Sequence, residues 1–260
     1  GLERDYATVV GAPLSCAEIA SAADEGDAQA DAALQRYEQR LARALAAVIN
    51  VIDPHVIVLG GGPIGCELAQ VFARFGSQVT IVQRQPTLLK REDPEIAAMV
   101  EQQFVEEGID VRLSHTAESI QVRDGVQVLT CVHDSQSVEI EFDTLLLALG
   151  REPHVHGFGL EDLNIALTPQ GTIEVNDYMQ TSMPNIYACG DVAGPYQFTH
   201  VAAHQAWYCS VNALFGRFRK FKVDYSVIPW ATFTDPEVAR VGLNEKQAQA
   251  ENIDYEVTRY

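Results

Sequence analysis

The chain has 260 residues, of which 47% are hydrophobic, so it is long enough to bury one large core or two small ones. Its formal net charge is -18, which argues against a nucleic-acid partner because affinity for nucleic acid depends on neutralising phosphates with Lys and Arg. No apolar run approaches the roughly 20 residues that a membrane-spanning helix requires, so we also expect no membrane partner.

The cysteines give no sign of a metal site or a disulfide framework. Cys16, Cys66, Cys131, Cys189 and Cys209 are scattered, without a Cys-x-x-Cys pair. This spacing favours reduced thiols in a cytoplasmic protein, and no redox-active dithiol is predicted.

The first quarter of the chain is predicted to be helical. Short helical patches fill the Ala-rich stretch from Gly1 to Glu25. A long amphipathic helix is expected from Asp27 to Asn50, because apolar residues such as Leu34 and Leu41 recur on one face. The helix ends before Pro54.

A glycine-rich turn follows the first predicted strand. Residues 55–67 read His-Val-Ile-Val-Leu-Gly-Gly-Gly-Pro-Ile-Gly-Cys-Glu, in which four apolar residues form a buried strand. We expect Gly60 to permit a tight turn, Gly62 to let the backbone approach a pyrophosphate, and Gly65 to let the next helix lie close to the strand. The alternative is a plain structural turn. The predicted phosphate-binding set is Gly60, Gly61, Gly62, Pro63, Ile64 and Gly65.

The elements after this turn complete a nucleotide-binding pattern. A helix from Gly65 to Phe75 is closed by Gly76, and a second strand runs from Gln78 to Val82, which makes a βαβ unit. Further on, Asp124-Gly125 is typical of a hairpin turn. The other predicted elements are a helix from Pro94 to Val105 and strands at 109–113, 119–123, 126–132, 138–142 and 144–149, the last of them buried.

The second half has fewer regular elements. Residues 186–191, Ile-Tyr-Ala-Cys-Gly-Asp, predict a second buried strand that ends in Gly-Asp. A helix is expected from about Thr199 to Phe215, and further strands begin at Pro229.

The residue at the end of the second strand bears on the choice of nucleotide. An acid there accepts from the ribose 2′-OH of NAD and repels the 2′-phosphate of NADP. The chain has Gln83 at this position, followed by Arg84, Lys90 and Arg91, so NADP is favoured over NAD. The alternative is that Arg84 and Lys90 are solvated loop charges.

From Gly61 to Tyr260 the chain resembles the flavoprotein disulfide reductases, closest to their mercuric reductase and lipoamide dehydrogenase-like members. The motifs that carry this resemblance are the run from Gly61 to Val82, Gly150-Arg-Glu-Pro, the Gly-Asp of residues 190 and 191, and the stretch from Pro229 to Gly242. The resemblance implies an α/β protein. It would contain a Rossmann-like NAD(P) domain at 55–149 with a parallel sheet and an antiparallel meander, a partial FAD domain at 150–225, and a truncated α+β dimerisation domain at 226–260.

Residues 1–62 resemble a different family. The run from Tyr37 to Gly62 is similar to the late helix and strand of ROK-family sugar kinases, in which the glycine run belongs to an ATP site. The sequence therefore has the look of two family fragments joined near Gly60, with residues 1–54 as a helical kinase-like segment.

The reductase resemblance implies roles for four residues. Glu67 would pair with a lysine beside the flavin, or would be an acid in the first turn of its helix. Gly190 and Asp191 would bind the flavin, with the Asp191 carboxylate on the ribityl chain; the alternative is that Asp191 is a helix N-cap. Gly150 would belong to the hinge back to the flavin domain. No role is implied for His200 and His204, which have metal-ligand spacing but no evident third ligand, so no metal is predicted.

The resulting functional prediction is an oxidoreductase in which NAD(P)H reduces FAD, with homodimers in a full-length parent. The redox cysteine pair, the first FAD half and the His-Glu pair of the resembling family find no match here, so we expect no turnover by this chain alone. Two alternatives stay open, a fragment of an ATP-dependent sugar kinase and a non-catalytic nucleotide-binding module.

Overall fold

The computed structural model describes residues 2–11, 13–37, 40 and 54–260. The chain divides into two compact units. The first consists of Gly1–Ala148 with Thr232–Glu237, and the second of Leu149–Ala231 with Val238–Tyr260. Each unit is described below by itself.

The N-terminal residues are helical, as predicted. Helices α1 (Leu2–Val10) and α2 (Cys16–Asp24) and the helical residues 28–37 share a small core that includes Tyr6 and Ile19. Residues 38–39 and 41–50 of the expected long helix lie outside the described residues.

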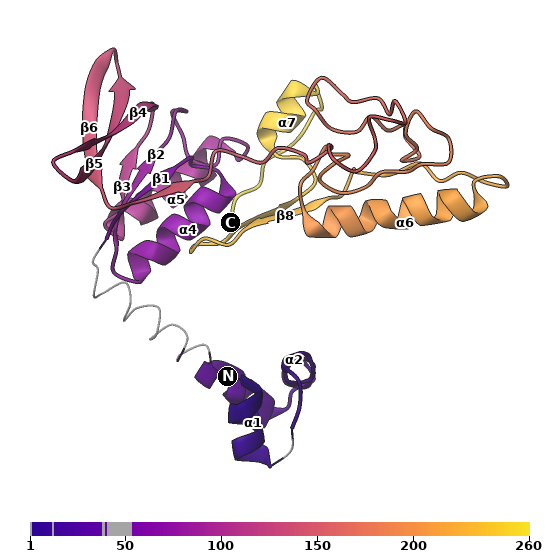
Figure 1. Ribbon diagram of the computed structural model, residues 1–260, viewed down its shortest axis with the longest axis horizontal. Coiled ribbons are helices and arrows are strands. Elements are labelled where there is room, and N and C mark those ends of the chain that lie inside the picture. Colours follow the sequence, from indigo (N-terminus) through magenta and orange to yellow (C-terminus); the bar gives the residue numbers. More distant parts are fainter. Residues whose placement is uncertain (1, 12, 38–39, 41–53) are drawn as a thin grey trace. The chain divides into compact units, whose positions relative to one another are not determined.

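A four-stranded parallel sheet forms the centre of the first unit. Its strands are β1 (His55–Leu59), β2 (Gln78–Val82), β3 (Asp110–Arg112) and β7 (Thr144–Leu147), in the order β3-β2-β1-β7 (Figure 1). Helices α4 (Pro63–Arg74) and α5 (Pro94–Glu106) connect β1 to β2 and β2 to β3. Because parallel strands need such crossovers, the alternation of strand and helix in the sequence predicted this sheet correctly.

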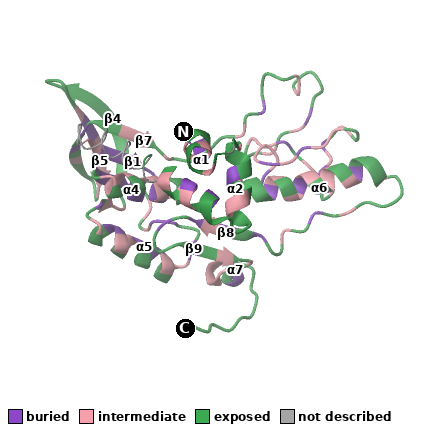
Figure 2. Ribbon diagram, turned by 90° about the horizontal axis from the view of Figure 1, so that it is seen from below, coloured by how far each residue is buried: buried purple, intermediate pink, exposed green. Residues whose placement is uncertain are grey.

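The predicted antiparallel meander is also present. It contains β4 (Thr116–Arg123), β5 (Val126–His133) and β6 (Gln136–Phe142). Asp124 and Gly125 have φ of 53° and 86°, the left-handed conformation that a two-residue hairpin requires. Residues of β5 and β6 share a buried cluster with Ile57 and Val82 of the parallel sheet, whereas β4 is exposed along its length (Figure 2).

One strand prediction was right in position but wrong in burial, and another was wrong. The strand expected at 144–149 is β7, which ends at Leu147. It is an edge strand of the sheet and Leu147 is 64% exposed, so the strand is not buried as expected. The expected strand at 186–191 is a loop with one bridge, between Gln180 and Tyr187. An apolar run of that length forms a ladder only when a neighbouring strand supplies hydrogen bonds, and among the described strands none lies beside it.

The second unit is built around α6 (Thr199–Phe215), whose bounds agree with the prediction. The C-terminal part of the chain contains β8 (Pro229–Thr232), β9 (Val238–Val241) and α7 (Glu245–Ala250). Strands β8 and β9 pair with each other.

One face of α4 holds the residues between β8 and β9, all within the first unit. Gln70 is 3% exposed and its amide both donates to the backbone oxygen of Asp235 at 2.8 Å and accepts from the Asp235 N–H at 2.8 Å. One turn along, Arg74 donates to Glu107 at 2.7 Å and to the Asp235 carboxylate at 2.7 Å. Arg74 is the main cause that lowers the pKa of Glu107.

We predict that Gln70→Ala lowers the free energy of unfolding by about 1–3 kcal/mol, because it leaves the Asp235 backbone groups without their side-chain partners. Urea denaturation of the chain measures this change. Gln102→Ala is the matched control, since Gln102 lies exposed on α5 and donates a hydrogen bond to Glu106 of the same helix, and it is expected to change stability by no more than about 0.5 kcal/mol. Equal losses in both variants would contradict this account of Gln70.

Candidate nucleotide-binding site

The glycine-rich turn lies between the end of β1 and the start of α4. Gly60 has φ of 110°, a conformation that residues with a side chain rarely adopt, and its N–H donates to the Val82 oxygen at 2.9 Å. The turn is thereby fixed to the end of the neighbouring strand β2. Gly60 thus occupies the tight turn that the sequence predicted.

The other glycines of the turn differ in how much space surrounds them. A Cβ added to Gly65 would lie 1.9 Å from the backbone oxygen of Gly60, so no side chain fits where α4 crosses the turn. A Cβ on Gly61 would lie 2.6 Å from Leu88. A Cβ on Gly62 would meet nothing within 4 Å, so the backbone there faces open space.

Helix α4 begins at this open point. Gly62 is its N-cap, with extended backbone and no side-chain hydrogen bond, and Pro63 is its first residue. Because the first N–H groups of a helix have no partner within the helix and lie at the positive end of its dipole, this end suits an anion. Pro63 and Ile64 are exposed at the same end.

The loop after β2 is held against the glycine turn. Leu89 donates its N–H to the Gly61 oxygen at 2.8 Å, and Leu88 is fully buried. Gln83 is half-buried, with its amide 3.4 Å from the Thr87 oxygen. Arg84 and Lys90 are exposed on this loop. The structure therefore gathers the glycine turn and the predicted nucleotide-selecting residues at one end of the parallel sheet.

Cys66 and Glu67, in the first part of α4, have different surroundings. Burial is the main cause that raises the pKa of Cys66 to about 12, and its thiol lies 3.6 Å from the Gly61 oxygen, so it is a packing residue. Glu67 accepts a hydrogen bond from the Phe233 N–H at 2.9 Å. It is the fifth residue of α4, so the interpretation as a first-turn acid was wrong. The flavin role of Glu67 stays a prediction.

In the second unit, Asp191 contacts Arg151 in space, and Gly150 directly precedes Arg151 in the sequence. The carboxylate of Asp191 pairs with the Arg151 guanidinium at 3.0 Å, and Arg151 also donates to the Gln197 oxygen at 2.5 Å. Gly150 has φ of 125°. The N-cap of α6 is Phe198, so Asp191 does not cap that helix as the alternative proposed. No local pattern marks this ion pair, because Arg151 and Asp191 lie far apart in the sequence.

Gln205 is a second residue that the sequence analysis missed. It is fully buried on α6 and accepts from the Gly190 N–H at 2.6 Å. Its amide nitrogen donates to the Gly194 oxygen at 2.6 Å and to the Tyr225 hydroxyl at 2.8 Å. A buried amide with this many partners fixes the loop around Gly190 to α6.

The side chains of His200 and His204 hydrogen-bond to backbone oxygens. Their Nε2 atoms lie 2.9 Å from the Pro229 oxygen and 2.7 Å from the Asp224 oxygen. Within residues 2–11, 13–37, 40 and 54–260, no cluster of three or more His, Cys, Asp or Glu side chains suits a metal ion. The described helices also include none long and apolar enough to cross a membrane.

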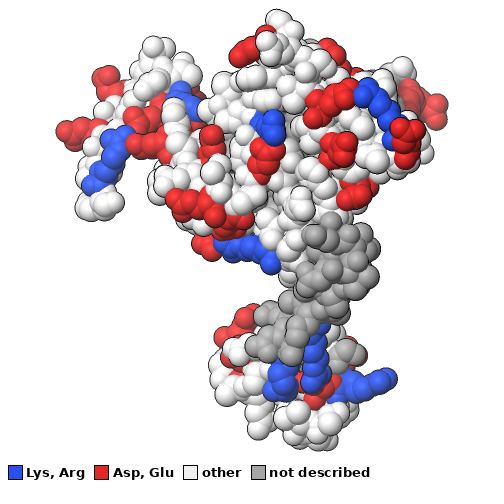
Figure 3. All heavy atoms as spheres, turned by 90° about the vertical axis from the view of Figure 1, so that its left-hand side faces the viewer, with Lys and Arg blue, Asp and Glu red and all other residues white. Residues whose placement is uncertain are grey.

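Charge on the surface is mainly acidic. On the face drawn in Figure 3, Asp and Glu side chains are spread widely and basic side chains form smaller groups between them. In such a field an anionic ligand is attracted only where cations gather locally. Arg84 and Lys90 are exposed cations on the loop that is held against the glycine turn.

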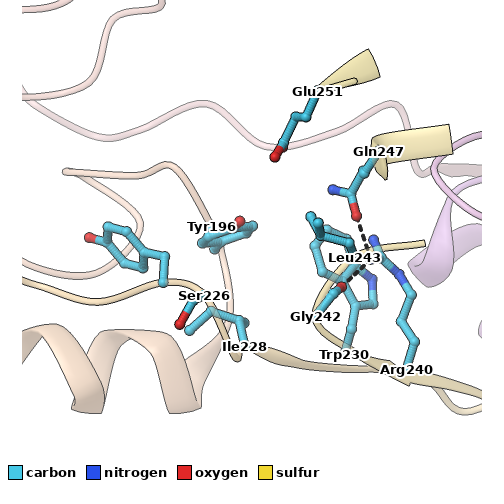
Figure 4. Close-up of a pocket in the computed structure, with 10 residues that line it drawn as sticks. Tyr196, Ser226, Ile228, Trp230, Arg240, Gly242, Leu243, Gln247 and Glu251 are labelled. Atoms are coloured by element: carbon cyan, nitrogen blue, oxygen red, sulfur yellow. Dashed lines mark hydrogen bonds between the residues drawn. The ribbon is translucent and has the colours of Figure 1, made fainter. Parts of the chain in front are cut away.

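A pocket of about 270 Å³ lies in the second unit (Figure 4). Tyr196, Tyr225 and Trp230 form aromatic parts of its wall, and the Arg240 guanidinium lies 4.3 Å from the Trp230 ring centroid. Arg240 Nη1 donates to the Gly242 oxygen at 2.9 Å and to Gln247 at 2.8 Å. These contacts give Arg240 a structural role in joining β9 to the start of α7.

Comparisons with known proteins show which proteins this chain resembles. Residues 8–206 match the family model described as pyridine nucleotide-disulphide oxidoreductase, and residues 228–260 match the dimerisation domain of the same group. A mercuric reductase of Lysinibacillus sphaericus is 39% identical over 207 residues, which cover 79% of this chain and 37% of that protein. A dihydrolipoyl dehydrogenase of Mycobacterium leprae is 37% identical over 206 residues, covering 79% of this chain and 44% of that protein.

A solved structure of a flavoprotein disulfide reductase is also similar to this chain. The HOCl-induced flavoprotein disulfide reductase RclA from Escherichia coli has a TM-score of 0.67 and 33% identity, covering 76% of this chain and 44% of that chain. The present chain thus spans less than half the length of these three relatives. The match from residue 8 includes most of the segment compared with sugar kinases, and none of these relatives is a kinase, so that resemblance gains no support.

We predict that Gly65→Ala lowers the free energy of unfolding by about 1–3 kcal/mol or more, because its methyl group would overlap the Gly60 oxygen. Gly62→Ser is the matched comparison. Its side chain enters open space and serine is a good N-cap, so stability is expected to change by a few tenths of a kcal/mol. Urea denaturation of both variants measures these changes in the free energy of unfolding. A loss of stability in Gly62→Ser as large as that in Gly65→Ala would contradict the steric role assigned to Gly65.

Proposed function

This chain belongs to the pyridine nucleotide-disulphide oxidoreductase family, and from that premise we propose that residues 55–149 bind NADP(H) within an enzyme that transfers hydride from the nucleotide to FAD. Residues 150–225 would contribute to the flavin domain and residues 226–260 to the dimer interface of a homodimer in the whole protein. We further propose a cytoplasmic setting, in which the free thiols stay reduced.

The observation that carries the proposal is the geometry between β1 and α4. Gly65 allows the helix to approach the turn so closely that the first N–H groups of α4 lie directly after the strand. Open space at Gly62 leaves room for a pyrophosphate against the backbone. Residues Gly60 to Gly65 therefore fit the pyrophosphate of the pyridine nucleotide that the family name implies.

The preference for NADP over NAD is proposed from the loop after β2. Gln83 at the end of this strand carries no charge that would repel a 2′-phosphate, and Arg84 and Lys90 are exposed cations on the same loop. Guanidinium and ammonium groups bind phosphate through charge-assisted hydrogen bonds. NAD is the alternative.

The flavin side is proposed from Gly190 and Asp191. FAD supplies the two-electron chemistry when it is bound, and the chain's own residues hold and orient it. The Asp191 side chain is 41% exposed and its carboxylate acts as an acceptor, so it can accept from a ribityl hydroxyl while Arg151 holds it in place. Gln205 fixes the adjacent Gly190 N–H.

The kinase alternative has no observation in its favour. Gly65 and the elements from β2 to β7 fit a dinucleotide site and have no explanation in an actin-like kinase. A non-catalytic nucleotide-binding module remains the second proposal, because it needs the same turn and requires no turnover.

We predict that Arg84→Ala weakens NADPH binding about tenfold or more and leaves NADH binding nearly unchanged, because a hydrogen bond to a charged group contributes about 1.5–3 kcal/mol. Isothermal titration of wild type and variant with NADPH, NADH and ATP measures this effect.

Arg123→Ala is the matched control, since Arg123 is an exposed arginine of the meander paired with Glu139. It should leave all three affinities unchanged. Equal losses for NADPH and NADH in Arg84→Ala would contradict the role of Arg84. Tighter binding of ATP than of either pyridine nucleotide would contradict the proposed function itself.

A further inference from the structure

Two cysteines that lie apart in the sequence meet beside the loop at Gly190. Cys209 lies on α6, and its thiol is 3.7 Å from the backbone oxygen of Ala188, the residue before Cys189. On the other side of Cys189, the Gly190 N–H bonds to Gln205 at 2.6 Å. The loop at 188–190 therefore runs along α6 with Cys189 between two points of contact.

The contacting helix positions explain why the loop at Cys189 lies against Cys209. Ala202, Gln205 and Cys209 follow one another at spacings of three and four residues, so they share one face of α6. A Cβ on Gly190 would lie 3.3 Å from the Ala202 Cβ, so the loop approaches this face closely. Cys189 is a neighbour that helps to raise the pKa of Cys209, and both residues are partly exposed to solvent.

The surroundings of Cys209 make its thiol a weak acid. Burial is the first cause that raises the pKa of Cys209 to about 12, followed by the neighbouring Cys189. Cys209 therefore keeps its proton near neutral pH. Cys66 and Cys131 are buried elsewhere, and Cys16 is exposed in the N-terminal helices.

We infer that Cys189 and Cys209 form an oxidisable thiol pair that hydrogen peroxide converts into a disulfide between the Gly190 loop and α6. The Cys189 thiolate attacks one peroxide oxygen, the O–O bond breaks, and the departing hydroxide takes up a proton to leave as water. The sulfur of Cys209 then attacks the sulfenic sulfur, the S–O bond breaks, and the Cys209 proton leaves with that oxygen as a second water. Two thiols and one peroxide give one disulfide and two waters.

The disulfide would tie down the residue that precedes Gly190 and Asp191, the predicted flavin contacts. Oxidation would thus lock this loop onto α6, and a reducing thiol would release it. The inference depends on the contacts within the second unit and is independent of nucleotide binding.

Peptide mapping tests the pair directly. The reduced, folded chain is treated with hydrogen peroxide, remaining thiols are alkylated, and the protein is digested with chymotrypsin, which cuts after Tyr187, Tyr196 and Tyr208 and separates the two cysteines. We expect a disulfide-linked pair of peptides and the loss of two hydrogens from the intact mass. The linked peptides should disappear on reduction. When the chain is oxidised in urea, the link between Cys189 and Cys209 should no longer be favoured over links to Cys16.

Variants distinguish the role of Cys189, which attacks the peroxide, from that of Cys209, which attacks the sulfenic sulfur. Cys209→Ser should accumulate a sulfenic acid at Cys189 that dimedone labels, Cys189→Ser should leave Cys209 unlabelled, and the exposed-thiol control Cys16→Ser should retain the link. Circular dichroism confirms that each variant is folded. Free thiols at both positions after oxidation, sulfonic acids without a link, or links to Cys16 in equal yield in the folded chain would overturn the inference.

Discussion

The close approach of α4 to the end of β1 is the contact on which the rest of the first unit depends. At Gly65 the helix backbone passes so near the Gly60 oxygen that a single methyl group would overlap it. This approach sets where the helix begins and thereby where its first N–H groups lie. The Gly60 N–H also bonds to β2, and the Gly61 oxygen accepts from Leu89, so the turn joins two strands and the loop between β2 and α5.

The same helix connects this turn to residues that are distant in sequence. On a face away from the glycines, Glu67, Gln70 and Arg74 hold the backbone and side chains of residues 233–235. A carboxylate that family resemblance places beside a flavin thus also has a structural partner within the first unit. Because the helix performs both tasks, a displacement at the glycine turn would also disturb the contact with the residues between β8 and β9.

Much of the first unit could be predicted from sequence because its signals are local. Alternation of apolar residues, the Asp124-Gly125 turn and the glycine spacing each specify structure over a few residues, and the strands of this unit, α4 and α5 lie close to where these patterns placed them. The comparison with sugar kinases also rested on a short local pattern, an Ala-rich helix followed by a Val-Ile strand and glycines. Many α/β proteins share such a pattern, and the family match over residues 8–206 does not support it.

Contacts between distant residues could not be predicted in the same way. Burial of Gln205 and the contact of Cys209 with the loop at Ala188 arise where α6 packs on a loop, and the ion pair of Arg151 with Asp191 joins two residues that are distant in sequence. No periodicity marks these contacts. The wrong strand at 186–191 has a related cause, because a ladder depends on a neighbour that the run itself cannot specify. Residue roles at the flavin side are likewise matters of tertiary packing.

The central claim is that the first N–H groups of α4 bind the pyrophosphate of a pyridine nucleotide. It is tested most directly by titrating the ¹⁵N-labelled chain with NADP⁺ and following its amide resonances by NMR. The account predicts that the largest shifts occur at Gly62, Ile64 and Gly65, with smaller shifts along the loop after β2. Saturable binding that leaves these three amides unchanged while others shift would contradict it.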